Sequence, residues 1–281
     1  MSEPYSPSTK RPIVAVMTDF GSGDGDVGVM KGVIAGITPN VHIIDVTHEV
    51  APQNIPSGAW ILASGYRYYP PDTVFICVVD PGVGSTRGAI AVHAGNWFFV
   101  GPDNGLFTYI YHEQPIHEAV VLNNPAYHLP QVSSTFHGRD IFAPTGAYLA
   151  QGVSLHDLGE QVDPTTLQRL AAITPERQGG RIVSHILHID HFGNLITSIP
   201  LTMVPTLFDS PGARVDFPTS QAVVDQRRRF FAQGEEDSQP FIFADSSGFV
   251  GIAVRNGSAA RVLGVRMGTP TILTLADNEA V

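Results

Sequence analysis

Cysteine, basic residues and long apolar runs are all scarce in this sequence, and each scarcity excludes a class of protein. The one cysteine among 281 residues, Cys77, has no partner for a disulfide within the chain, so we expect a cytoplasmic protein. Lys and Arg total 16 against 26 Asp and Glu, and the formal net charge of −10 argues against nucleic-acid binding, because a phosphate backbone requires a basic face. No apolar run approaches the ~18 residues of a membrane span, and residues 1–11 lack the apolar core of a signal peptide. We therefore expect no nucleic-acid or membrane partner, and a disordered tail at residues 1–11.

The first half of the chain alternates short apolar runs with longer mixed segments. Runs that are apolar at every position, such as Val74–Val79, suit strands buried on both faces of a parallel sheet. Their alternation with helical segments predicts an open α/β sheet. The expected strands are Ile13–Met17, His42–Val46, Val74–Val79 and a hairpin of Ala89–His93 with Trp97–Val100; the expected helices are Val29–Ile37, Ser57–Tyr66 and Ile141–Gln151.

The pattern changes after residues 178–180. From there the chain consists of short β-type segments divided by Gly, Pro, Asn and Ser, and the only helix candidate is Ala222–Phe231. This texture predicts a separate, smaller all-β domain, either a barrel or a sandwich. We place the α/β domain at residues 12–175 and the β-barrel domain at residues 180–281.

Aspartates follow two of the expected parallel strands. Asp19 comes after "IVAVMT" and Asp80 after "VFICVV". Ligands of open α/β sheets bind beyond the carboxyl ends of the strands, so both carboxylates are site candidates. Each aspartate also suits a turn or a helix cap, and the residues alone leave this alternative open.

A glycine pattern typical of dinucleotide sites is present, with acidic residues inside it. Gly23-x-Gly25-x-x-Gly28 satisfies the G-x-G-x-x-G spacing, and Asp45 lies where a ribose-binding acid would be expected. Asp24 and Asp26, however, would face the pyrophosphate with two further negative charges. The same acids suit a cationic group, such as the ammonium of an amino acid or a sulfonium.

The segment "VVDPGVGSTRG" lacks the Gly-Lys-Ser/Thr ending of a phosphate-binding loop. Its glycines would instead let Arg87 fold back toward Asp80, and such an ion pair keeps the carboxylate charged. His137 is a further candidate, followed by Gly138, which permits close backbone approach, although a polar loop histidine remains an alternative.

A second histidine-rich segment, "HILHIDHFGN", contains side chains of the types that bind metals. On a strand His188 and Asp190 would share one face while His191 would point to the other, so we expect no metal here.

Seven motifs in order along the chain resemble those of the S-adenosylmethionine (SAM) hydrolases, also called SAM hydroxide adenosyltransferases, which are relatives of the fluorinase and the chlorinase. The motifs run from Thr18 to about Val254: "TDFG", "DVTHEVAPQNIPSGAWIL", "VVDPGVGSTR", "GPDNGL", "STFHGRDIFAP", "IDHFGNLIT" and "SSGFVGIAV". The resemblance implies a Rossmann-like three-layer α/β domain followed by a β-barrel domain. It also implies a homotrimer whose active sites lie between the first domain of one subunit and the second domain of the next.

The reaction that the resemblance implies is hydrolysis of SAM to adenosine and L-methionine, by attack of water on the ribose C5′. SAM is then the substrate and no cofactor is expected. The family's catalytic Asp–Arg–His triad falls on Asp80, Arg87 and His137, and which triad member takes the proton from water stays open.

The resemblance also assigns substrate-binding residues. Asp19 corresponds to the aspartate that holds the ribose hydroxyls. The remaining positions correspond to residues around the methionine ammonium (Asp24, Asp26, Asp190), the adenine (Phe192, Asn194, and the backbone near Asn256 and Ser258) and the methionine carboxylate (Ser246, Ser247).

Departures from the halogenases favour water over halide as the nucleophile. The fluorinase has tyrosine and threonine where this chain has Asp80 and Val83, and serine where it has Gly138. A carboxylate beside a halide ion is repulsive. The alternatives are a SAM-dependent halogenase, a non-catalytic sensor that binds SAM or adenosine, and a dinucleotide-dependent dehydrogenase.

Overall fold

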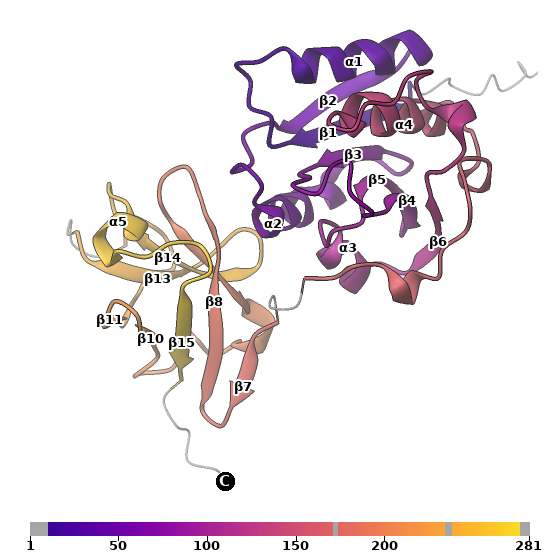
Figure 1. The fold of residues 1–281 in the computed structure, drawn as a ribbon. Helices are drawn as coiled ribbons and strands as arrows, with labels where there is room; N and C mark the ends of the chain where they lie inside the picture. The colour runs from indigo at the N-terminus through magenta and orange to yellow at the C-terminus, as the bar shows by residue number, and fades with distance from the viewer. Residues whose placement is uncertain (1–10, 171–173, 234–237, 276–281) are drawn as a thin grey trace, which may run out of the picture. The chain divides into compact units, whose positions relative to one another are not determined.

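The computed structural model describes residues 11–170, 174–233 and 238–275. The chain divides into two compact units, Met1–Leu170 and Ala171–Val281, and each is described by itself (Figure 1). The disordered tail predicted for residues 1–11 lies outside the described residues except for Arg11. The predicted domain limits, residues 12–175 and 180–281, stay predictions.

A six-stranded mixed sheet forms the centre of the first unit, with the strand order β2-β1-β3-β5-β4-β6. Strands β2, β1, β3 and β5 run parallel, whereas β4 is antiparallel to both β5 and β6. The sheet is therefore mixed rather than wholly parallel, and it contains the expected β4–β5 hairpin. The strands are β1 (Ile13–Thr18), β2 (His42–Thr47), β3 (Val74–Val78), β4 (Ala89–Ala94), β5 (Trp97–Pro102) and β6 (Ile116–Val121).

Helices cover both faces of this sheet (Figure 1). Successive residues of β1 enter different cores: Val14 and Val16 belong to one apolar cluster, Ala15 and Met17 to the other. Helices α1 (Asp26–Ile37) and α4 (Ala143–Ala150) contact each other over the first cluster, and α2 (Ile55–Gly65) contacts α3 (Thr108–Glu113) over the second. A strand apolar at every position, as β3 is, follows from burial on both faces. The Rossmann-like classification stays a prediction.

The expected helix over Ile141–Gln151 is more complex than its sequence pattern suggests. One π-helical turn, η3 (Gly138–Phe142), leads directly into α4, and His137 occupies the position before it. The short 3₁₀ helices of the unit are η1 (Tyr66–Tyr68), η2 (Pro125–Tyr127), η4 (Leu155–Asp157) and η5 (Pro164–Thr166).

The second unit is a barrel-like β structure around one apolar core. Its nine-stranded sheet has the order β11-β10-β15-β8-β9-β14-β13-β12, with β7 paired to β8, and β11 contacts β13 so that the sheet nearly closes. The strands are β7 (Glu176–Gln178), β8 (Arg181–Ile189), β9 (Leu195–Pro200), β10 (Arg214–Phe217), β11 (Ala222–Val224), β12 (Gln226–Arg227), β13 (Pro240–Ala244), β14 (Phe249–Val254) and β15 (Pro270–Thr274); the helices are η6 (Leu201–Met203) and α5 (Ala259–Leu263).

The helix expected around Ala222–Phe231 is wrong. The segment instead contains β11 and β12, and β11 pairs antiparallel with β10, with Val224 opposite Val215. Gln221 adopts a left-handed conformation, φ 57°, in the turn between these two strands. Strand pairing and the burial of Val224 prevail over the helical pattern of the local sequence.

Within the described part of the chain, every helix is too short or too polar to cross a bilayer.

Candidate active site

The carboxyl ends of β1 and β3 bring two predicted site residues to one edge of the first unit's sheet. The strands are parallel neighbours with Thr18 opposite Val78. Asp19 follows Thr18 directly, and Asp80 lies two residues beyond Val78. This is the edge at which open α/β sheets bind ligands.

Arg87 folds back onto Asp80 across the glycine loop. Its Nε lies 3.1 and 3.0 Å from the two carboxylate oxygens, and its Nη2 lies 2.5 Å from Oδ2. The Asp80 side chain is only 4% exposed and that of Arg87 10%. The guanidinium also lies over the Phe142 ring, 5.3 Å from its centroid. A shielded charge pair of this geometry fixes the positions of both side chains.

His137 completes a cluster of three side chains. Its Nδ1 lies 2.8 Å from Arg87 Nη2. Because a guanidinium only donates, Nδ1 accepts this hydrogen bond, and the proton of the neutral ring is on Nε2. Burial lowers the pKa of His137, and the charge of Arg87 lowers it further. The structure therefore favours a neutral His137 whose Nδ1 lone pair is already in use.

The loop from Asp80 to Arg87 is held by two neighbouring segments. Gly84 has φ +76°, and a Cβ added there would lie 2.2 Å from the Ser134 carbonyl oxygen. Only glycine allows this approach between the loop and the His137 segment. On the other side, Asn104 Nδ2 donates to the Val79 carbonyl at 2.9 Å, and Asp103 N donates to the Gly88 carbonyl at 2.9 Å.

The segment that carries His137 is braced by a buried carboxylate. Asp140 is fully buried and accepts from Ser133 N at 2.8 Å and from Arg139 Nε at 2.6 Å. Burial alone would raise the pKa of Asp140, but these contacts bring it below its usual value. Neither Asn104 nor Asp140 was predicted to act in this way, although Asn104 lies in the motif "GPDNGL" and Asp140 lies in the motif that carries His137.

Asp19 lies in a separate network at the end of β1. Its Oδ2 accepts from Gln53 N at 2.7 Å. The preceding residue, Thr18, has its hydroxyl 2.9 Å from His48 Nδ1, and His48 Nε2 lies 3.0 Å from Asp45. Asp45 also pairs with Lys31 at 2.7 Å, so the supposed ribose acid of the dinucleotide pattern is engaged by two partners. This arrangement weakens the dinucleotide hypothesis.

The acidic residues of the glycine-rich segment are exposed. Asp26 is the first residue of α1 and Asp24 lies in the bend before it. Neither forms an ion pair within the described ranges, so both remain available to a cationic ligand.

The second unit gathers part of the predicted adenine-binding set around one pocket. A hollow of about 570 Å³ is lined by Phe192, Asn194, Asn256 and Ser258, and also by two residues that the sequence did not single out, Phe231 and Arg261. Phe231 was missed because its segment was expected to be helical.

The loop that borders this pocket depends on a carboxylate and a glycine. Asp190 accepts from Phe192 N at 2.9 Å, from Asn194 N at 2.8 Å and from Asn194 Nδ2 at 2.7 Å. Gly193 has φ +83°, and a Cβ there would lie 2.1 Å from Ser258 Oγ. Asp190 thus shapes the loop, while Phe192 is left 73% exposed at its tip.

Ser246 and Ser247 lie at the other end of β14 from this pocket. They occupy the turn between β13 and β14, where Ser247 N donates to Asp245 Oδ1 at 2.8 Å. Residue 252 of β14 pairs with Leu195 near the pocket, whereas Phe249 pairs with Pro200.

The histidine-rich segment was expected to bind no metal, and that expectation stays a prediction. Among the described residues, no three His, Cys, Asp or Glu side chains are close enough together to hold an ion.

The structure brings Asp80, Arg87 and His137 into direct contact and places Asp19 at the same sheet edge. The predicted residues beyond position 180 belong to the second unit.

Comparison with known proteins identifies relatives over nearly the whole chain. The (R)-S-adenosyl-L-methionine hydrolase of Salinispora arenicola is 40% identical over 263 residues, which is 92% of this chain and 95% of that protein. A crystal structure of an uncharacterized conserved protein from Thermotoga maritima superposes with a TM-score of 0.86 and 33% identity, covering 93% of this chain and 99% of that one. The fluorinase of an Actinoplanes species is 26% identical over 303 residues, 96% of this chain and 100% of that protein.

Family models describe the two halves of the chain separately. The model for the SAM hydroxide adenosyltransferase N-terminal domain matches residues 14–159, and the model for the C-terminal domain matches residues 184–272. The chain belongs to the SAM hydroxide adenosyltransferase family.

Proposed function

We propose that this protein hydrolyses SAM to adenosine and L-methionine. The observation that carries the proposal is the shielded Asp80–Arg87–His137 cluster at the ligand-binding edge of the sheet, in a chain 40% identical to a SAM hydrolase. The cluster supplies a charged carboxylate that can orient water, and the family supplies the substrate.

The difficult part of this reaction is to make water a competent nucleophile. A lone pair of the water oxygen forms the new bond to the ribose C5′. At the same time the C5′–S bond breaks, and the electron pair of that bond goes to the sulfur. The leaving group is a neutral thioether, so no general acid is required. Holding water in line with the C5′–S bond removes the entropic cost of an encounter, which contributes several kcal/mol.

We propose that Asp80 rather than His137 takes the proton, and two features of the geometry support this. The Nδ1 lone pair of His137 accepts from Arg87, and its Nε2 carries a proton. Asp80 Oδ2 accepts from both Nε and Nη2 of Arg87, whereas Oδ1 accepts only from Nε and so retains a second lone-pair site for the proton of water. Once the C–O bond has formed, the attached water is a strongly acidic protonated alcohol, for which a carboxylate is a sufficient acceptor. His137 then acts as a positioning residue through Arg87.

Substrate binding in this proposal uses both units. Asp19 binds the ribose hydroxyls, Asp24, Asp26 and Asp190 surround the ammonium, and Ser246 and Ser247 contact the carboxylate. Phe192, Asn194, Asn256 and Ser258 surround the adenine, and we add Phe231, whose ring lines the same pocket. No cofactor takes part, because a sulfonium substrate brings its own leaving group.

We further propose a cytoplasmic homotrimer in which each site combines the first unit of one subunit with the second unit of its neighbour. The division of the proposed residues between two units supports this arrangement. Mixing Asp80→Asn protein with Asn194→Ala protein tests it. Subunit exchange should restore part of the turnover if sites are shared, and should restore none if every site lies within one chain.

A product assay in ¹⁸O-labelled water tests the reaction itself. Purified protein incubated with SAM should release methionine and adenosine that carries the label at its 5′ oxygen. SAM binding without product would instead support a sensor, and a 5′-halo-adenosine formed in the presence of halide would support a halogenase. The carboxylate of Asp80 argues against the halogenase, since it would repel a halide ion.

A further inference from the structure

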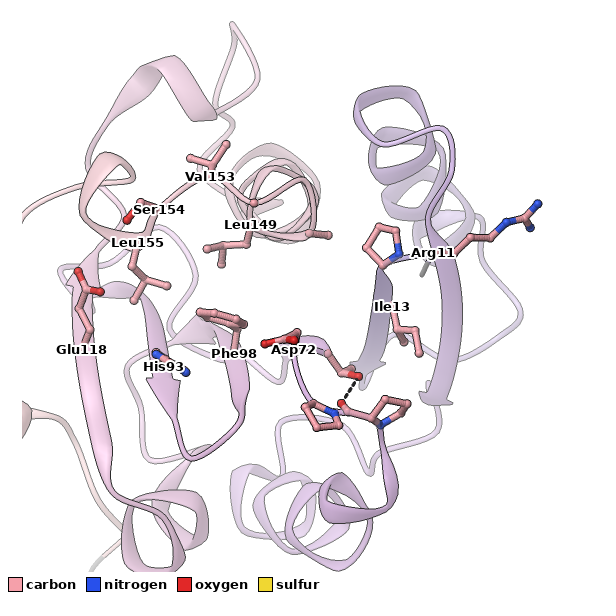
Figure 2. Close-up of a pocket in the computed structure, with 16 residues that line it drawn as sticks. Arg11, Ile13, Asp72, His93, Phe98, Glu118, Leu149, Val153, Ser154 and Leu155 are labelled. Atoms are coloured by element: carbon pink, nitrogen blue, oxygen red, sulfur yellow. Dashed lines mark hydrogen bonds between the residues drawn. The ribbon is translucent and has the colours of Figure 1, made fainter. Parts of the chain in front are cut away.

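A second pocket lies at the opposite edge of the first unit's sheet. Its volume is about 690 Å³, and its lining includes Ile13 at the start of β1, Thr73 just before β3 and Leu149 in the last turn of α4 (Figure 2). Asp19 and Asp80 follow the other ends of the same two strands. The pocket is therefore separate from the proposed catalytic cluster, and the hydrolase mechanism makes no use of it.

The inner surface of this pocket is suited to a flat apolar body. The rings of Phe98 and His93 are stacked, with centroids 4.6 Å apart and planes at 19°. Figure 2 shows Leu149 and Leu155 beside Phe98 on one side of the space, with Ile13 across from them. Both leucines are almost completely buried. A ring or an alkyl chain placed here would bury apolar surface on both of its sides.

The charged groups of the pocket are mainly negative. Asp72 and Glu118 both line it, both are close enough to His93 to act on its charge, and neither has an ion-pair partner among the described residues. Burial lowers the pKa of His93, and nearby His117 lowers it further, so His93 is neutral near pH 7. Arg11 lines the rim, but Figure 2 shows its guanidinium directed away from Phe98.

The end of α4, which also borders the pocket, adds little to this polarity. The carbonyls of its last turn already accept hydrogen bonds from the backbone N–H groups of Gln151, Gly152 and Val153. The two carboxylates without an ion pair and the aromatic face favour a cation over an anion.

We propose that this pocket binds a small organic cation, an ammonium group carried on an aromatic or alkyl body. The body occupies the space between Phe98 and Ile13, and the ammonium lies toward Asp72, with Glu118 as a second negative charge in the pocket lining. A bare metal ion is a poorer fit, because the described residues offer no cluster of three ligating side chains here.

The test compares probes that share a body and differ in charge. 2-Phenylethylammonium, 2-phenylethanol and phenylacetate are titrated into the full-length protein and followed by calorimetry and by ligand-observed NMR. We expect the ammonium to bind at least tenfold more tightly than the alcohol, with phenylacetate weakest. Equal binding of the ammonium and the alcohol would overturn the proposal.

Two variants locate the binding. Asp72→Asn combined with Glu118→Gln should weaken the ammonium at least tenfold and leave the alcohol unchanged, while SAM turnover, which reports correct folding, stays at its original rate. Asn suits residue 72 because its φ is +67°. Glu176→Gln, at an exposed position in the second unit, is the matched control and should change nothing. Displacement of the ammonium by adenosine would place it in the substrate site and refute the second pocket.

Discussion

Arg87 donates a hydrogen bond to His137 Nδ1 over 2.8 Å, and this contact exists only while that nitrogen carries no proton. Protonation of His137 would set an N–H against an N–H of Arg87. Burial and the Arg87 charge lower the pKa of His137, in agreement with this geometry. The contact between Arg87 and His137 therefore depends on the protonation state of His137.

The first prediction concerns the acid side of the pH profile. As pH falls through the lowered pKa of His137, below the usual ~6.5, the contact with Arg87 is lost and kcat/KM should fall. His137→Asn retains an acceptor near the Nδ1 position and cannot take up a proton in this range. We expect it to keep part of the turnover and to lose this acid limb, measured by adenosine release from about pH 4.5 to about pH 8.5.

The matched control for this profile is His112→Asn, at an exposed position on α3, which should leave the acid limb in place. An unchanged acid limb in His137→Asn would assign the titration to another group.

The lowered pKa of His137 also predicts that the free energy of unfolding decreases as pH falls from about 6.5 toward that pKa, because the unfolded chain takes up the proton first.

The second prediction concerns the carboxylate that orients water. Asp80→Asn keeps the shape of the side chain and removes its charge, so Arg87 loses its ion-pair partner and water loses its acceptor. We expect kcat to fall by a factor of about 10² or more. SAM affinity, measured by calorimetry, should change by much less. Asp157→Asn, at an exposed position, serves as the control, and normal turnover by Asp80→Asn would remove Asp80 from the mechanism.

The third prediction concerns the approach of two loops. Gly84→Ala would bring a Cβ to 2.2 Å from the Ser134 carbonyl oxygen at a φ of +76°, so the two loops must separate. We expect a loss of more than about 1 kcal/mol in the free energy of unfolding, and a marked loss of kcat. Gly152→Ala has a similar φ of +93° with open space around it, so it isolates the backbone strain. Equal effects of the two variants on kcat would show that the loop contact is unimportant.

Much of the first unit's architecture follows from local patterns in the sequence. A strand such as Val74–Val78, buried at every position, is predictable because both faces of its sheet are covered. The return of Arg87 to Asp80 was also expected, since it needs only a glycine-rich loop between two opposite charges. The strands within Ala222–Phe231 were not expected, because β11 pairs with β10 and β12 with β13, and both partner strands lie outside this segment.

The supporting contacts of the site were beyond what sequence reasoning alone could supply. Asn104 and Asp140 act through particular backbone atoms, and which atoms they meet depends on the completed fold. The π-helical turn after His137 likewise has no periodic signature in five residues. The substrate roles assigned to both units depend on the family resemblance and stay predictions.

The last prediction tests Asn104 as a positioning residue. Its Nδ2 donates to the Val79 carbonyl next to Asp80, and its Oδ1 accepts from Leu106 N at 3.2 Å. Asn104→Asp keeps the second contact but sets a carboxylate against the Val79 carbonyl, so the end of β3 should shift and carry Asp80 with it. We expect kcat to fall about tenfold or more with KM little changed, since a misplacement of about 1 Å can cost 10²-fold.

Asn104→Ala removes both hydrogen bonds without adding repulsion. If Asn104 has only a structural role, Asn104→Ala should unfold at a lower denaturant concentration than Asn104→Asp, and kcat should follow stability. A positioning role instead predicts that Asn104→Asp has the lower kcat even if it unfolds at the higher denaturant concentration. If kcat in the two variants simply follows their stability, Asn104 supports the fold and does not position Asp80.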